Sequence, residues 1–98
     1  MKEITLTLSL YFFLFSEGSA ADFYWVGGTG NWTDLNHWAT TSGGAVHPIA
    51  LPGTGDDVFF DANSFSLAGQ TVSLLTGDKY CRNMSWTGVT NNPAFNSR

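Results

Sequence analysis

The chain has 98 residues, a net charge of −4 from eight acidic and four basic residues, and a single cysteine. This size allows one small domain, the acidic balance excludes nucleic-acid binding through a clustered basic face, and one cysteine excludes an intramolecular disulfide. Only 12% of the residues are charged while glycines and aromatic residues are frequent, which is typical of a turn-rich all-β extracellular domain rather than a disordered chain.

Residues 1–21 have the pattern of a secretory signal peptide. A charged start is followed by the apolar run Ile4–Phe15 and by a small-residue exit, and cleavage after Ala20 or Ala21 would leave small residues at the required positions. An apolar helix of this length spans about 18 Å, which is short of the roughly 30 Å of a bilayer core. The alternative is a buried N-terminal strand, because residues 5–10 alternate. We predict that residues 1–21 are removed on export and that residues 22–98 form a single small β domain without a membrane span.

A strand, a glycine turn and one helical turn are the first elements predicted in that domain. Residues 23–26 are aromatic and β-branched, which favours a strand. Residues 27–31 contain three glycines, whose freedom at positive φ favours a tight turn. Trp32, Leu35 and Trp38 follow at i, i+3 and i+6, so one helical turn would place them on one side.

Loops and short strands alternate over the rest of the chain. Residues 41–57 contain four glycines and two prolines and predict a loop. Further strands are predicted at 58–60, 70–75 and 79–86, separated by turn-forming residues. Residues 91–98 are turn-forming types without a closing strand, so we expect the chain to be the N-terminal part of a longer protein. The pattern predicts an all-β fold with Gly/Pro/Asn-rich turns, either the start or cap of a β-solenoid (parallel β-helix) or a β-sandwich.

The tryptophans have two interpretations. Trp25, Trp32 and Trp38 could form a flat platform that stacks on sugar rings, or they could supply the core that a small domain without disulfides needs. Packing is the favoured interpretation. The predicted core consists of large apolar residues from the predicted strands and the helical turn: Trp25, Trp32, Trp38, Val58, Phe60, Val72 and Leu74.

One weak internal similarity relates the two ends of the domain. The segments 25–31 and 86–92 share Trp, Gly, Thr and Asn at equivalent positions. They could be stacked repeats, or simply two strand exits with similar turn chemistry, which is the interpretation we favour.

No catalytic arrangement is present in the sequence. His37 and His47 lie in different loops, and no serine has the surroundings of a nucleophile elbow. Cys81 precedes Arg82, which could lower the pKa of the thiol, but a buried inert cysteine is the favoured interpretation. We therefore predict that the chain is not an enzyme.

Four oxygen-bearing residues around residues 58–60 are the best candidates for a metal site. Asp56, Asp57, Asp61 and Asn63 are closely spaced and could hold calcium. Their spacing lacks the Asp-x-Asp-x-Asp-Gly pattern, and Asp57 and Asp61 can equally well end a strand and turn the chain. No other cofactor is predicted.

Two sequence blocks carry a resemblance to a known group of proteins. Residues 24–32 (YWVGGTGNW) with Trp38, and residues 52–61 (PGTGDDVFFD), resemble the N-terminal segment of large secreted cell-surface proteins of Bacteroidetes-type bacteria. Residues 70–72 and 81–88 (CRNMSWTG) continue the likeness. A looser likeness is to the G8-type modules of extracellular β-helix proteins.

The resemblance implies an adhesin-like protein at the bacterial cell surface, built as a β-solenoid that follows a capping segment. The implied partners are the following β-repeats of the same polypeptide, and glycans or a host or cell surface. The function expected is thus a non-catalytic structural or adhesin-like module. The alternative is a carbohydrate-binding module, or the N-terminal part of a polysaccharide-degrading β-helix enzyme.

Overall fold

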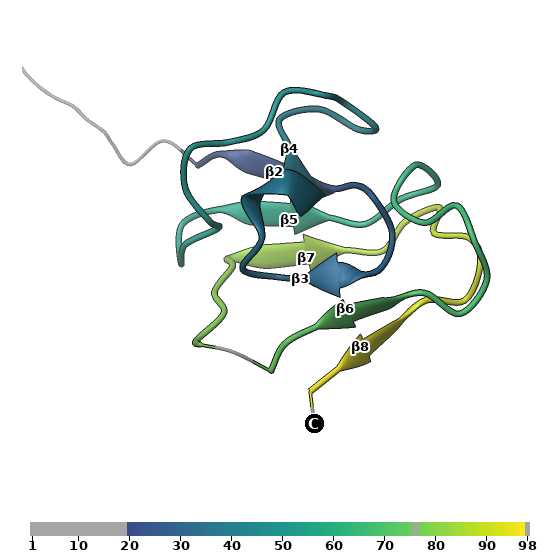
Figure 1. The fold of residues 1–98 in the computed structure, drawn as a ribbon. Helices are drawn as coiled ribbons and strands as arrows, with labels where there is room; N and C mark the ends of the chain where they lie inside the picture. The colour runs from purple at the N-terminus through teal and green to yellow at the C-terminus, as the bar shows by residue number, and fades with distance from the viewer. Residues whose placement is uncertain (1–19, 76, 98) are drawn as a thin grey trace, which may run out of the picture.

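The computed structural model describes residues 20–75 and 77–97, so the predicted signal peptide falls outside the described residues except for Ala20 and Ala21. The described residues form short strands and one 3-10 turn, η1 (Figure 1). The elements in chain order are β2 (Asp22–Trp25), β3 (Gly30–Asn31), η1 (Leu35–His37), β4 (Trp38–Ala39), β5 (Asp57–Phe59), β6 (Thr71–Ser73), β7 (Asn83–Ser85) and β8 (Ala94–Asn96). The all-β prediction is confirmed.

The strands form two sheets, and the chain passes back and forth between them. The first sheet has the order β4-β2-β5-β7 and the second the order β3-β6-β8. Strands β2, β5 and β7 are parallel, as are β3, β6 and β8, whereas β4 is antiparallel to β2. Figure 1 shows β2, β5 and β7 as successive arrows pointing the same way. Three passes of the chain, β2–β3, β5–β6 and β7–β8, therefore each place one strand in each sheet.

The register stacks equivalent residues of the three passes on one another. Phe23 pairs with Val58 and Val58 with Met84, while Tyr24, Phe59 and Ser85 form the next column. Successive strand residues point to opposite faces, so Phe23 and Trp25 share one face and Tyr24 lies on the other. The columns that contain Phe23 and Trp25 point inward and supply the core. The core also includes Phe65, a residue that the sequence pattern did not identify.

Two glycines carry the chain from the first sheet to the second. Gly27 and Gly28 follow β2 with φ of 85° and 74°, in the region that side chains with a Cβ rarely adopt. A Cβ on Gly28 would also lie 2.3 Å from Nε2 of Gln70. The turn is fixed by the Trp25 indole, whose Nε1 donates a 2.8 Å hydrogen bond to the Gly28 carbonyl.

Several predicted boundaries change in the structure. The strand expected at 79–86 is paired only over β7, because residues 79–82 form the irregular connection from the second sheet back to the first. The expectation that residues 91–98 hold no strand is wrong: Ala94–Asn96 forms β8, paired with β6. Asn91 and Asn92 adopt φ of 73° and 48° just before it, so the turn-forming residues lead into a strand.

Candidate functional site

The three candidate sugar-stacking tryptophans lie in the core. Trp25 and Trp38 are fully buried and Trp32 is 3% exposed, so none of them offers a free ring face. Trp38 packs edge-on against both other indoles, with ring centroids 5.1 Å from Trp25 and 4.9 Å from Trp32. Its Nε1 donates to the Trp32 carbonyl at 2.8 Å. The core assignment is confirmed for six of the seven predicted residues, and the seventh, Leu74, is half-buried.

The four candidate calcium ligands are split between the two ends of β5. At its start, Asp56 accepts hydrogen bonds from the backbone N–H groups of Ala21 and Gly53, at 3.1 and 2.8 Å. The Arg82 guanidinium donates two hydrogen bonds, of 3.0 and 2.9 Å, to the Asp57 carboxylate. These hydrogen bonds hold the pKa of the Asp57 carboxyl below its ordinary value. Asp56 therefore links the second pass of the chain to the start of the first, and Asp57 links the second pass to the third.

Beyond the end of β5, the other two candidates form a turn. Asp61 accepts from the backbone N–H of Asn63 at 2.9 Å, the pattern of an Asx turn, and from the Ser42 hydroxyl at 2.6 Å. Asn63 donates to the same hydroxyl, which ties the turn to the loop before β5. Within residues 20–75 and 77–97, no group of three or more His, Cys, Asp or Glu side chains has the geometry of a metal site.

Histidine and cysteine also take structural roles. His37 stacks on Trp25 with ring centroids 4.9 Å apart, and its Nδ1 lies 2.7 Å from the Val26 carbonyl. Nδ1 of His47 lies 2.7 Å from the Trp38 carbonyl. Burial, together with the nearby negative charge of Asp57, raises the pKa of the Cys81 thiol. The effect is opposite to the activation that a neighbouring arginine could produce.

The most distinctive surface is the free edge made by β7 and β8, each the last strand of its sheet among the described residues. In a parallel ladder, alternate residues bond to one neighbour and the intervening residues face the other way. Here the backbone carbonyl of Ser85 accepts a hydrogen bond from the Phe60 N–H, and the backbone carbonyl of Asn96 accepts one from the Leu74 N–H, both at 2.8 Å. The backbone groups of Met84 and Phe95 consequently face the open side.

Burial along the inward columns falls at this edge. In the first column Phe23 is 6% exposed, Val58 is fully buried and Met84 is 40% exposed. In the second sheet Val72 is fully buried, and Phe95, which pairs with it, is 36% exposed. The apolar positions therefore repeat from pass to pass, except that Gly30 takes the first place in the second sheet, and those of the last pass are not covered.

Aromatic rings continue along the stack to the same edge. Trp25, Phe60 and Trp86 each follow the paired column of Tyr24, Phe59 and Ser85 by one residue. Their rings stack, with centroids 5.9 Å apart for Trp25 and Phe60 and 4.4 Å apart, at 9°, for Phe60 and Trp86. Trp25 and Trp86 thus occupy equivalent places, which favours the stacked-repeat interpretation of their similarity.

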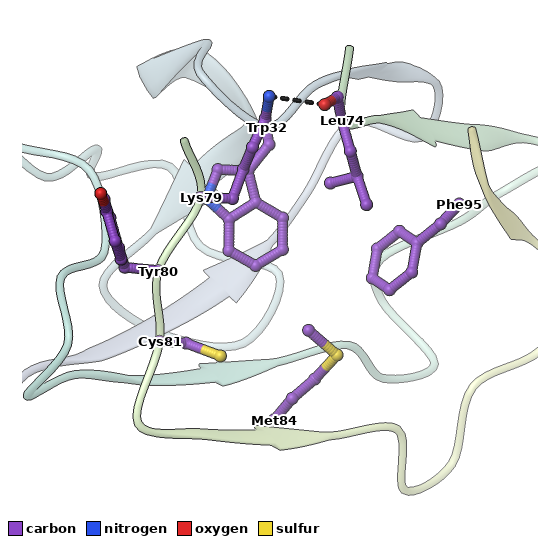
Figure 2. Close-up of a pocket in the computed structure, with 7 residues that line it drawn as sticks. All are labelled: Trp32, Leu74, Lys79, Tyr80, Cys81, Met84 and Phe95. Atoms are coloured by element: carbon purple, nitrogen blue, oxygen red, sulfur yellow. Dashed lines mark hydrogen bonds between the residues drawn. The ribbon is translucent and has the colours of Figure 1, made fainter. Parts of the chain in front are cut away.

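A pocket of about 120 Å³ lies between the two strands of the free edge (Figure 2). Its lining consists of Trp32, Leu74, Lys79, Tyr80, Cys81, Met84 and Phe95. Figure 2 shows Met84 and Phe95 reaching from β7 and β8 toward the Trp32 ring. Indole Nε1 of Trp32 is the one buried side-chain polar atom without a hydrogen-bond partner in the described part of the chain. The volume approaches that of an apolar cavity that holds a benzene ring, about 150 Å³.

The residues of this edge were missed at the level of the sequence. The signal that could have found them is the repeated pair of an apolar residue and an aromatic residue two positions later: Phe23 and Trp25, Val58 and Phe60, Met84 and Trp86. Such short pairs become informative only once the register shows that they stack.

Comparisons with protein families, with curated proteins and with solved structures find no match to this chain. Among the described residues, no helix is long and apolar enough to cross a membrane.

Proposed function

We propose that this chain is a non-catalytic structural module of an exported cell-surface protein, in which it starts a parallel β-solenoid and offers a free edge to the following β-repeats of the same polypeptide. The observation that carries the proposal is the fall in burial along the inward columns. A monomer that ended at β7 and β8 would leave apolar side chains and unpaired strand edges open to water, a state that natural β proteins avoid.

The opposite end of the first sheet supports the capping part of the proposal. Strand β4 lies outside β2 and runs antiparallel to it, which interrupts the parallel stacking on that side. In Figure 1 the loop between β4 and β5 arches over this end. Solenoid repeats need such a distinct terminal unit, because each regular repeat exposes an apolar edge.

Export and the bacterial cell surface rest on the apolar N-terminal run and on the resemblance described above. The structural role rests on the described residues alone. The candidate calcium ligands and the candidate platform tryptophans are engaged in turns, one ion pair and packing, so the free edge is the feature that a partner would complete.

The test is an extended chain in which a second copy of residues 75–97 directly follows Ser97. We expect the added pass to pair with the free edge and to slow hydrogen exchange at the backbone amides of Met84 and Phe95, measured by NMR under reducing conditions. Unchanged exchange at both amides would contradict the proposal. Titration of the original chain with soluble oligosaccharides, followed by tryptophan fluorescence, is the companion measurement. We expect no saturable response, whereas saturable binding would favour a carbohydrate-binding module.

A further inference from the structure

We propose that the free edge selects its partner by register, accepting a parallel strand that places an apolar side chain over Met84 and an aromatic side chain two residues later over Trp86. The inference rests on the proposed function and names the kind of strand that the continuing polypeptide supplies. It is carried by the way the first three strands of this sheet already fit one another.

The first element of the selection is alternation. Phe23, Val58 and Met84 lie in one inward column, and the residues two positions later, Trp25, Phe60 and Trp86, lie in the next. The residue between them points outward, as with Tyr24 and Phe59, whose rings stack 4.8 Å apart on the opposite face. A shift of one residue would exchange the two faces of an incoming strand, placing its polar residues over the apolar columns.

The second element is the aromatic stack that ends at Trp86. Phe60 lies almost parallel to both Trp86 and Phe65, at interplanar angles of 9° and 5°. Trp86 is half-buried and continues the stack begun by Trp25. Aromatic pairs in offset or edge-on arrangements gain stability beyond that of their area burial. An aromatic side chain at the matching position therefore gains more than an aliphatic one.

The third element is the pocket between Met84 and Phe95. The column above Met84 borders this apolar space, whose lining also includes Leu74 and the ring of Trp32. An apolar side chain at the Met84 position of the next pass covers the pocket and excludes water from it. A polar side chain there would lose its hydrogen bonds to water without a partner to replace them.

On the second sheet the selection depends on one apolar position and the polar position that follows it. Val72 pairs with Phe95, while the neighbouring outward column runs through Asn31, Ser73 and Asn96. The incoming strand on this side carries an apolar residue over Phe95, followed by a small polar residue over Asn96. The complete pattern is apolar-x-aromatic on one strand and apolar-polar on the other.

The test compares two extended chains of identical length and composition. Both carry the added copy of residues 75–97 after Ser97; in the second, the copied tetrapeptide Asn-Met-Ser-Trp is reordered to Met-Asn-Ser-Trp, so that no one-residue shift of the strand restores the apolar-x-aromatic spacing. We expect the faithful copy to slow exchange of the Met84 amide by about tenfold or more, and the reordered copy to leave it as in the original chain.

The outcomes separate this inference from the proposed function. Equal protection by the two copies would overturn the register selection while leaving the edge as a docking surface. Absence of protection by both copies would overturn the register selection and the proposed function together. A third chain, in which only the copied Trp86 is replaced by Leu, measures the aromatic preference: protection equal to that of the faithful copy would remove the aromatic requirement.

Discussion

Replacing Trp38 by alanine should remove the largest single contribution to the core. The ring is fully buried and packs against four aromatic neighbours: Phe23, Trp25, Trp32 and Phe60. Burial of a tryptophan removes about 150–250 Å² from water, which at about 25 cal/mol per Å² corresponds to about 4–6 kcal/mol. Measured Trp→Ala substitutions cost about 3–5 kcal/mol, and the Trp32 carbonyl also loses its donor.

Small domains are stable by only about 5–15 kcal/mol, so a loss of this size can unfold the Trp38→Ala variant completely. Trp38→Phe keeps most of the apolar ring and removes the indole N–H. We expect it to lower the free energy of unfolding by about 1–2 kcal/mol. Urea denaturation followed by far-UV circular dichroism measures both variants.

The matched control is Ile49→Ala, because Ile49 is 99% exposed. We expect this substitution to change the free energy of unfolding by less than about 0.5 kcal/mol. If Trp38→Ala were equally mild, the indole could not be packed as described, and the reasoning from the aromatic core would be refuted.

Three further predictions concern other parts of the domain. Gly30→Ala should lower the free energy of unfolding by about 1–3 kcal/mol, because the new Cβ would lie 2.1 Å from Nε2 of His37 and force its ring from the stack on Trp25. Arg82→Gln should lower the melting temperature at pH 7 and lose this effect in acid: the lowered pKa of Asp57 stabilises the fold above the ordinary carboxyl pKa, and this contribution disappears as the pH falls through the lowered value. N-terminal sequencing of exported protein should give Ala21 or Asp22 as the first residue, because cleavage after Ala20 or Ala21 leaves small residues at the required positions.

Each of these has its own control. Adding His37→Ala to Gly30→Ala should recover part of the lost stability, and a double variant no more stable than the single one would show that the clash lies elsewhere. For Arg82→Gln, a pH-independent difference from the original chain would separate the effect from the ion pair. Exported protein that still begins at Met1 would contradict the signal-peptide prediction.

Much of the core is evident from local sequence. Trp25, Val58 and Phe60 are predicted to be buried because large apolar residues in short β-branched or aromatic runs have few other places in so small a domain, and the structure buries all three. Phe65 was not predicted, since it lies in the irregular loop between β5 and β6 rather than in a strand pattern. Strand β8 escaped prediction for a related reason: Ala94–Asn96 has a weak strand propensity and is held by pairing with β6.

The candidate site divides in the same way. Asp61 and Asn63 form a turn through contacts within four residues, so the sequence could suggest that role as an alternative to metal binding. The partnership of Asp57 with Arg82 joins residues 25 positions apart and depends on β5 and β7 lying side by side. Arg82 follows Cys81 in the sequence, but the pairing of β5 with β7 brings its guanidinium to Asp57.

The sequence by itself determined the all-β class, the glycine turn after the first strand and most of the aromatic core, because propensity, turn chemistry and hydrophobicity act over a few residues. Only the tertiary structure decided that the strands pair in parallel across long connections, and so that Phe23, Val58 and Met84 form one column. Strand register is a long-range property, since pairs of short strands are compatible with several alignments until the core selects one. The free edge of β7 and β8 follows from that register, because the columns of Val58 and Val72 end there at Met84 and Phe95, which are exposed.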